Sequence, residues 1–321
     1  MVDYDKYNSF LEKLNYVPIY SKAFWLDATC GKGNWDVYYF GEGNDIKAVM
    51  PYYLTTKPDG TKWITRPILT QNNGILFRHP VNQGLFARQK WEEKIINEAC
   101  DFIESLGLDG YEQQFHHSFD LPLPFFWRRF APSVRYTFII DTSVGYEIVE
   151  KNYASEVRNV VRKAAKICTI EECDDLHEFY SVNEKSFLRQ NISIPFTFEL
   201  FENLVANCKE HNCYKLFKAV DAEKNIHSVA MIVWDEKAAY WILNGSDPEY
   251  RNSQANAMLI DHAIKLACEL GVDFDFEGSV IKGVNHAFRE YGGRPIQYFR
   301  IRKLFSPELI RAEAEDTIAH L

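Results

Sequence analysis

Long apolar runs are missing from this 321-residue sequence. No stretch reaches the roughly eighteen consecutive apolar residues that a membrane-spanning helix needs, so we expect no membrane span. The N-terminal residues, Met1 to Lys6, lack the basic and apolar regions of a secretory signal. Seven cysteines occur, an odd number with no Cys-x-x-Cys pair. This pattern favours reduced thiols over a disulfide framework and predicts a cytoplasmic protein.

Positive charge is also scarce. The chain has 36 Lys and Arg against 45 Asp and Glu, a net charge of −9. Affinity for nucleic acids depends mostly on neutralising phosphates, so this balance argues against a general nucleic-acid binder, and we expect no DNA partner. The tight ligand turns of structural zinc are missing around the cysteines, the histidines show no metal spacing, and no Ser/His/Asp set is discernible. We therefore predict no metal site.

The region from Ala238 to Ile301 has the most regular pattern. The whole chain has the composition of a soluble globular protein, with 46% hydrophobic and 15% aromatic residues. Apolar runs and helical periodicity predict an ordered series of elements. These are a strand at 238–243, a loop at 244–253, a helix at 254–270 ended by Gly271, a strand at 272–276, a short helix near 284–291 and a strand at 296–301.

The first half repeats this plan. A hairpin at 36–54 corresponds to one at 214–234, and a helix at 91–106 ended by Gly107 corresponds to the helix ended by Gly271. The matched features follow in one order at an offset of about 160 residues, which we interpret as an internal duplication. We expect two α/β domains, residues 1–141 and 142–321, with the active cleft in the second.

A helix at about 153–166 connects the two halves. Its apolar side is formed by valines and alanine, while Arg158, Arg162 and Lys166 follow one another at intervals of four residues on a second face. Such a stripe fits two interpretations. It can hold the phosphates of a nucleotide-linked or lipid-linked acceptor or a tRNA end, or it can be a solvated helix face.

The order hairpin, strand, loop, helix, strand, helix, strand resembles the GNAT acyltransferase fold, and two such units joined by a basic helix resemble the FemABX and FemAB-like (CelD/BioF2-type) proteins. The residues that carry this resemblance are Tyr240–Pro248, Phe274–Ser279, Lys282-Gly283, Phe288–Gly293 and Tyr298–Arg300 in the second half, and Leu69–Gly74, Phe125–Trp127 and Arg135–Thr137 in the first. The resemblance implies tandem GNAT-like domains with mixed sheets and flanking helices, and transfer of an activated acyl or aminoacyl group to an amine or hydroxyl.

The sequence departs from the GNAT pattern at one important place. The coenzyme A pyrophosphate loop of typical GNAT enzymes is rich in glycine, whereas the matching segment here is Arg251 to Ala257 and has none. Without glycine the backbone N–H groups approach a phosphate less closely. We therefore expect no tightly bound cofactor, with acyl-CoA or aminoacyl-tRNA as a co-substrate. The coiled-coil arm of some FemABX members is also absent.

Transfer of an activated acyl group needs positioning, a base for the amine and donors for the oxyanion, but no enzyme nucleophile. We expect the site where the strand at 239–243 separates from the strand at 272–276. The candidate catalytic residues are Asp275, Glu277, Lys282 and Tyr298. The side chains of Asp275 and Glu277 leave the strand on one face. Lys282 is the best positive charge near the exit of this strand, and Tyr298 offers a phenol donor. Each has a structural alternative: the carboxylates can bind backbone amides of the following turn, Lys282 can be a solvated lysine, and Tyr298 can be core.

Candidate substrate-binding residues are Arg158, Arg162 and Lys166 of the basic stripe, Asn244 and Ser246 at the rim of the cleft, and Arg251. The leading hypothesis is a FemAB-like transferase that moves an acyl or aminoacyl group onto an amine of a phosphate-bearing cell-envelope or polysaccharide precursor. One alternative is a small-molecule N-acetyltransferase that uses acyl-CoA or an acyl carrier. The other is a catalytically inactive GNAT-like binding module.

Overall fold

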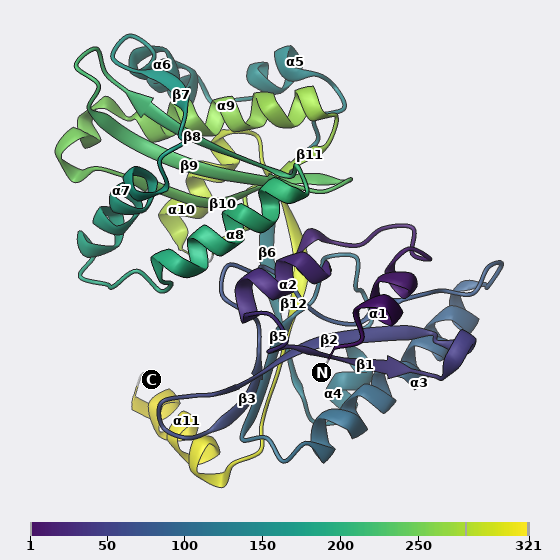
Figure 1. Cartoon of the computed structure of the whole chain (residues 1–321). Helices are drawn as coiled ribbons and strands as arrows, with labels where there is room; N and C mark the ends of the chain where they lie inside the picture. The colour runs from purple at the N-terminus through teal and green to yellow at the C-terminus, as the bar shows by residue number, and fades with distance from the viewer. Residues whose placement is uncertain (1, 280, 320–321) are drawn as a thin grey trace. The chain divides into compact units, whose positions relative to one another are not determined.

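The computed structural model describes residues 2–279 and 281–319 (Figure 1). The chain forms two compact units. Unit 1 consists of Met1–Arg135 together with Gln297–Leu321, and unit 2 consists of Tyr136–Ile296. This division differs from the expected domains 1–141 and 142–321, because the C-terminal segment packs with unit 1. No helix in the described part of the chain is long and apolar enough to cross a bilayer.

Unit 1 contains a mixed sheet in the order β1-β2-β3-β5-β12, with β4 paired to β2. Its strands are β1 (Asp36–Phe40), β2 (Ala48–Thr56), β3 (Lys62–Thr65), β4 (Leu76–Phe77), β5 (Gly110–Gln114) and most of β12 (Arg294–Leu304). Its helices are α1 (Tyr4–Leu11), α2 (Ala23–Cys30), α3 (Leu85–Ser105), α4 (Leu123–Trp127) and α11 (Pro307–Ala319).

Unit 2 contains a second mixed sheet in the order β6-β11-β10-β9-β8-β7. Its strands are β6 (Ala131–Ile140, the last five residues), β7 (Thr169–Glu172), β8 (Tyr214–Val220), β9 (Ile226–Trp234), β10 (Ala238–Ser246) and β11 (Asp273–Asp275). Its helices are α5 (Tyr146–Lys151), α6 (Ser155–Ala164), α7 (Leu176–Leu188), α8 (Phe198–Glu210), the 3-10 helix η3 (Pro248–Ser253), α9 (Ala255–Leu270) and α10 (Lys282–Glu290).

The two units share one connectivity. In each, a hairpin (β1-β2 or β8-β9) is followed by a third antiparallel strand (β3 or β10), a long helix (α3 or α9) and a strand parallel to the third (β5 or β11). The final strand is exchanged, because β5 pairs with β12 and β11 pairs with β6. This exchange explains why the unit boundaries differ from those expected from the repeat.

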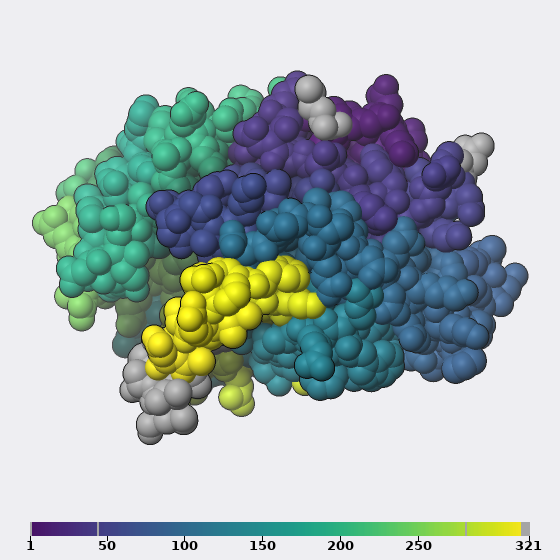
Figure 2. Space-filling model, turned by 90° about the horizontal axis from the view of Figure 1, so that it is seen from below, coloured from purple at the N-terminus to yellow at the C-terminus, as the bar shows by residue number. Residues whose placement is uncertain are grey.

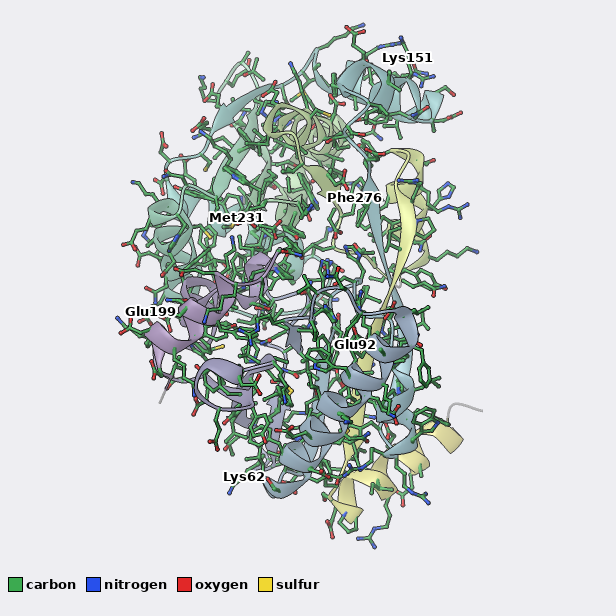
Figure 3. All side chains as sticks on the ribbon, turned by 90° about the vertical axis from the view of Figure 1, so that its right-hand side faces the viewer. Lys62, Glu92, Lys151, Glu199, Met231 and Phe276 are labelled. Carbon is green, nitrogen blue, oxygen red and sulfur yellow. The ribbon has the colours of Figure 1, made fainter. Side chains whose placement is uncertain are left out.

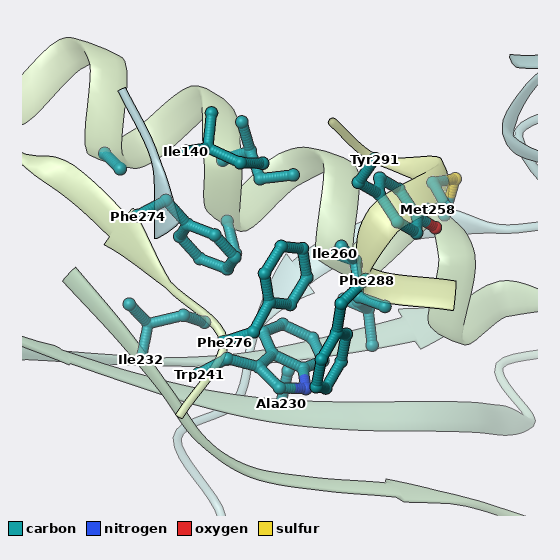
Figure 4. Packing of buried hydrophobic residues seen from close by; sticks show 14 of the residues in the cluster. Ile140, Ala230, Ile232, Trp241, Met258, Ile260, Phe274, Phe276, Phe288 and Tyr291 are labelled. Atoms are coloured by element: carbon teal, nitrogen blue, oxygen red, sulfur yellow. The ribbon is translucent and has the colours of Figure 1, made fainter. Parts of the chain in front are cut away.

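The core of unit 2 forms around α9 and the sheet (Figure 4). Ile260, Ile264 and Ala267 of α9 are buried on the face that their helical spacing predicts, whereas Leu270 at the end of the helix is exposed. Gly271 ends the helix in the left-handed conformation, with φ 71°. Residues 229–233 of β9 are buried in succession, as in a strand covered on both faces. The predicted helix 254–270 and strand 238–243 are confirmed, with β10 extending three residues further.

Candidate active site in unit 2

The parallel strands β10 and β11 pair over a short length. Their register joins Ala238 to Asp273, Ala239 to Phe274 and Tyr240 to Asp275, and β11 ends there. β10 continues to Ser246 against β9, with an irregularity between Trp241 and Leu243. Beyond Tyr240, one edge of β10 pairs with β9, and no described strand pairs with its other edge. The expected separation of the two strands is therefore present beside the turn that follows Asp275.

Asp275 holds this turn together. Its carboxylate is buried and accepts hydrogen bonds from the Thr137 hydroxyl and from the backbone N–H of Glu277, the latter at 2.7 Å. A short carboxylate that accepts an N–H two residues ahead stabilises a turn locally. This geometry corresponds to the structural alternative for Asp275.

Glu277 has a different environment. Its backbone adopts φ 62°, an uncommon conformation for a residue with a side chain, and its Oε1 is buried without a hydrogen-bond partner. Burial raises the pKa of this carboxyl from 4.5 to about 8, because the charged form loses its solvation. A buried carboxyl without a partner costs stability, so this side chain is a strong candidate for a functional group.

The turn that presents Glu277 is anchored on both sides. Phe276 stacks on Phe288 of α10, with ring centroids 4.4 Å apart, and its N–H donates to the Phe138 carbonyl at 3.0 Å. Figure 4 shows Phe276 among Trp241 and Phe288. Gly278, with φ 74°, passes so close to the Tyr136 carbonyl that a Cβ would collide with it. Only glycine fits at this position.

The other two predicted catalytic residues lie on other elements. Lys282 is exposed at the start of α10, and no described contact joins it to Glu277. Tyr298 is buried in β12 and belongs to unit 1, where it lies near Arg66. The structure therefore brings together Asp275 and Glu277 within unit 2.

The three residues of the basic stripe, Arg158 and Arg162 on α6 and Lys166 just after it, differ in their contacts. The Arg158 guanidinium donates to the carbonyls of Lys151 at 3.1 Å and of Tyr153, at the end of α5. Arg158 thus satisfies carbonyls at a helix C-terminus, which is a structural role. Arg162 and Lys166 are exposed, and their side chains have no hydrogen bond or ion pair among the described contacts.

The predicted rim residues lie at the end of β10. The Asn244 carbonyl accepts from Asn183 Nδ2 at 2.7 Å, and the Ser246 N–H donates to Ser186 Oγ at 2.6 Å. Both partners are on α7, so these contacts fix β10 to that helix. Gly245 permits the close approach, because a Cβ there would lie 2.5 Å from the Asn183 Cα.

Comparisons with known proteins agree with this architecture. Residues 151–286 match the model of the acetyltransferase (GNAT) domain. The structure of FemX superposes with a TM-score of 0.67 over 97% of this chain and 98% of that chain, at 12% identity. The fold is that of the FemAB-like GNAT proteins. The expected resemblance and the tandem GNAT-like fold class are thereby confirmed.

Two further solved structures are similar at low identity. The C-terminal domain of a proposed lysylphosphatidylglycerol synthetase from Agrobacterium fabrum has a TM-score of 0.58 at 10% identity, over 98% of this chain and 96% of that one. A tandem GNAT protein from the clavulanic acid biosynthesis pathway has a TM-score of 0.50 at 10% identity, over 85% and 83% of the two chains. No curated protein matches the sequence.

In this chain the segment that corresponds to the GNAT pyrophosphate loop is η3 and the start of α9. Arg251 is exposed there, and Gln254 precedes α9 in the left-handed conformation, with φ 56°. The Ala255 N–H donates to Ser253 Oγ at 3.3 Å, so one N–H of the helix N-terminus is bound by the chain itself. Among the described residues, no group of three or more His, Cys, Asp or Glu is arranged to hold a metal ion.

Sequence reasoning missed a hydrogen-bonded set in unit 2. His227 lies between Cys168, at 3.1 Å from Sγ to Nδ1, and Asp221, at 3.0 Å from Nε2 to Oδ2, and its ring stacks on Tyr250 at 4.4 Å. These residues are far apart in sequence, so no spacing could reveal them. Cys168 and His227 are buried. The set connects the β8-β9 turn to η3 and the end of α6, and we assign it a structural role.

Proposed function

We propose that the protein is an acyltransferase of the FemAB-like type, with Glu277 as its general base. The observation that carries this proposal is the Glu277 carboxyl, whose Oε1 is buried without a hydrogen-bond partner and whose pKa is raised to about 8, at the point where β10 and β11 separate. A base with a pKa near the working pH is well suited to accept a proton during catalysis.

In the proposed reaction an amine attacks the carbonyl of an activated ester or thioester. The nitrogen–carbon bond forms, the carbon–oxygen or carbon–sulfur bond to the leaving group breaks, and the amine proton passes to the Glu277 carboxylate. The leaving oxygen or sulfur takes this proton from Glu277, which restores the carboxylate. Asp275 acts as a positioning residue, because its bond to the Glu277 N–H sets the turn on which the base lies.

The proposed acceptor is an amine on a phosphate-bearing cell-envelope or polysaccharide precursor. The name of the lysylphosphatidylglycerol synthetase supports a phosphate-bearing acceptor and an aminoacyl group as the group transferred, and the likeness to FemX supports the same fold. Arg162 and Lys166 are the cations of unit 2 that we assign to the phosphate, since both are exposed, Arg162 on α6 and Lys166 in the turn that follows it. Arg158 is no longer part of this assignment, because its guanidinium binds backbone carbonyls.

The second candidate donor is acyl-CoA, which the match of residues 151–286 to the acetyltransferase domain favours. The absence of glycine from residues 251–257 favours an aminoacyl-tRNA donor instead. Either donor is a co-substrate in a cytoplasmic reaction that requires no tightly bound cofactor. Calorimetric titration with coenzyme A distinguishes the two donors, since only the acyl-CoA reaction needs coenzyme A to bind.

The test is transfer of label from acetyl-CoA or aminoacyl-tRNA to amine acceptors in precursor extracts. We expect transfer by the wild-type protein, a loss of at least a hundredfold in Glu277→Gln, and unchanged transfer in Glu223→Gln, a matched change in an exposed turn. Ligand binding without transfer by any donor and acceptor pair would instead support an inactive binding module and refute the proposal.

A further inference from the structure

Unit 1 has a pocket of about 460 Å³ that the proposed transferase site does not use. Its walls come from the segment after α1, the segment 72–81 around β4, the second and third turns of α3 and the loop after β5. Phe77, Phe115 and Phe119 supply an apolar lining. A pocket of this size with apolar walls and a few convergent polar groups is the usual form of a ligand site.

The polar side of this pocket is basic. Lys13, Arg78 and Arg88 line it, against the carboxylates of Glu92 and Asp120. Glu92 is buried on α3 (Figure 3) and is already bound, with its Oε1 at 2.5 Å from His79 Nε2 and at 2.9 Å from Arg88 Nε. Burial opposes its ionisation, but the hydrogen bonds from His79 and Arg88 outweigh burial and lower its pKa. The buried carboxylate therefore fixes the side chains of His79 and Arg88 in place.

Exposed apolar side chains lie on the segment that joins two of the pocket's walls. Val81, which lines the pocket, is 89% exposed, and Leu85 and Phe86 at the start of α3 are 71% and 79% exposed. These are the three most exposed large hydrophobic side chains among the described residues, and they lie within six positions of one another. Figure 2 shows part of the surface that the α3 region presents, in blue. A concentration of exposed apolar side chains marks an interaction surface.

Basic groups beside exposed apolar side chains match one partner. An anionic lipid surface offers phosphates at the level of the headgroups and apolar chains just beneath them, and interfacial segments combine Lys and Arg with Phe and Leu for this reason. The net charge of the whole chain is −9, so general electrostatics would repel such a surface. The cations are concentrated locally, where the apolar side chains are.

We propose that unit 1 docks on an anionic lipid surface, with Val81, Leu85 and Phe86 entering the interface and a headgroup phosphate binding in the pocket beside Lys13. This inference is independent of the proposed acyl transfer. It concerns peripheral binding and does not depend on the turn at Glu277.

The test is sedimentation of the full chain with vesicles of phosphatidylcholine, with and without phosphatidylglycerol, at low and high salt. We expect binding to the anionic vesicles and weaker binding at high salt. Phe86→Ser should weaken binding by about tenfold or more, since about 1.5–3 kcal/mol accompanies burial of such a side chain. Lys13→Gln should weaken binding by about fivefold on anionic vesicles only. Leu188→Ser, a matched change at an exposed leucine of unit 2, should leave binding unchanged.

A second measurement reports insertion directly. In Phe86→Trp the added fluorescence should be quenched by brominated lipid, relative to the wild-type protein measured in the same vesicles. Three results would overturn the proposal. They are no binding to any vesicle, binding of free glycerol phosphate in the pocket without vesicle binding, and self-association of the wild-type chain that Phe86→Ser abolishes, which would make the surface a contact between copies.

Discussion

The environment of Glu277 predicts that function and stability oppose each other at this residue. Its pKa is about 8 in the folded protein and 4.5 ordinarily, so between these values the native state holds a proton that the unfolded state has lost. The wild-type protein therefore loses unfolding free energy as the pH rises through this window, at up to about 1.4 kcal/mol per pH unit, or up to about 5 kcal/mol in total. Glu277→Gln keeps the shape of the neutral carboxyl and has no such loss.

We expect Glu277→Gln to match the wild-type protein in stability near pH 5 and to exceed it increasingly up to about pH 8, while transfer activity is lost. Urea unfolding at a series of pH values measures the first effect, and a pH–rate profile of the wild-type enzyme, rising with an apparent pKa near 8, measures the second. Equal stability differences at all pH values would show that the carboxyl is not buried as described, and the assignment of the base would then fail.

Three other changes test the neighbouring structure. Asp275→Asn should destabilise the protein by about 1.5–3 kcal/mol at neutral pH, because hydrogen bonds to a charged acceptor are weakened, and thermal unfolding measures this. Gly278→Ala should destabilise it by about 1–3 kcal/mol or more, since φ is 74° and the Tyr136 carbonyl occupies the space; a stable, active variant would contradict the close approach. Arg158→Gln should lower the melting temperature with little effect on KM, whereas Arg162→Gln should raise KM for a phosphate-bearing acceptor and leave stability unchanged.

The fold was accessible to sequence reasoning where periodicity is strong. The helix ended by Gly271 and the strands on either side of it follow from burial patterns that repeat every two or 3.6 residues. The helix predicted at 91–106 begins earlier, at Leu85. The prediction missed this start because the apolar side chains of the first turn are exposed and do not continue the buried face of the helix. The exchange of β6 and β12 could not be predicted, since pairing between distant strands leaves no local pattern.

The position of the candidate site stays a prediction, and the structure adds detail that the sequence could not supply. The spacing of Asp275 and Glu277 indicated one face of a strand, yet it could not show that one carboxylate is bound and the other is not. That difference arises from the Thr137 hydroxyl, which is 138 positions away along the chain. Arg158 differs, because the carbonyls that its guanidinium binds are only seven and five positions away, at Lys151 and Tyr153. The four-residue spacing of the basic stripe does not show that α5 ends there. A tertiary contact decides the role of Asp275, and a local contact decides the role of Arg158.

The pairing of β5 with β12 has a consequence for the order in which the protein can be made. The strand that completes the sheet of unit 1 is translated after the whole of unit 2, so a nascent chain carries β5 with an open edge until residues 300–304 leave the ribosome. Unit 2 has no such delay, because β6 is synthesised before the strand it joins. Shortening the chain before Arg294 should therefore harm the earlier-made unit more than the later one.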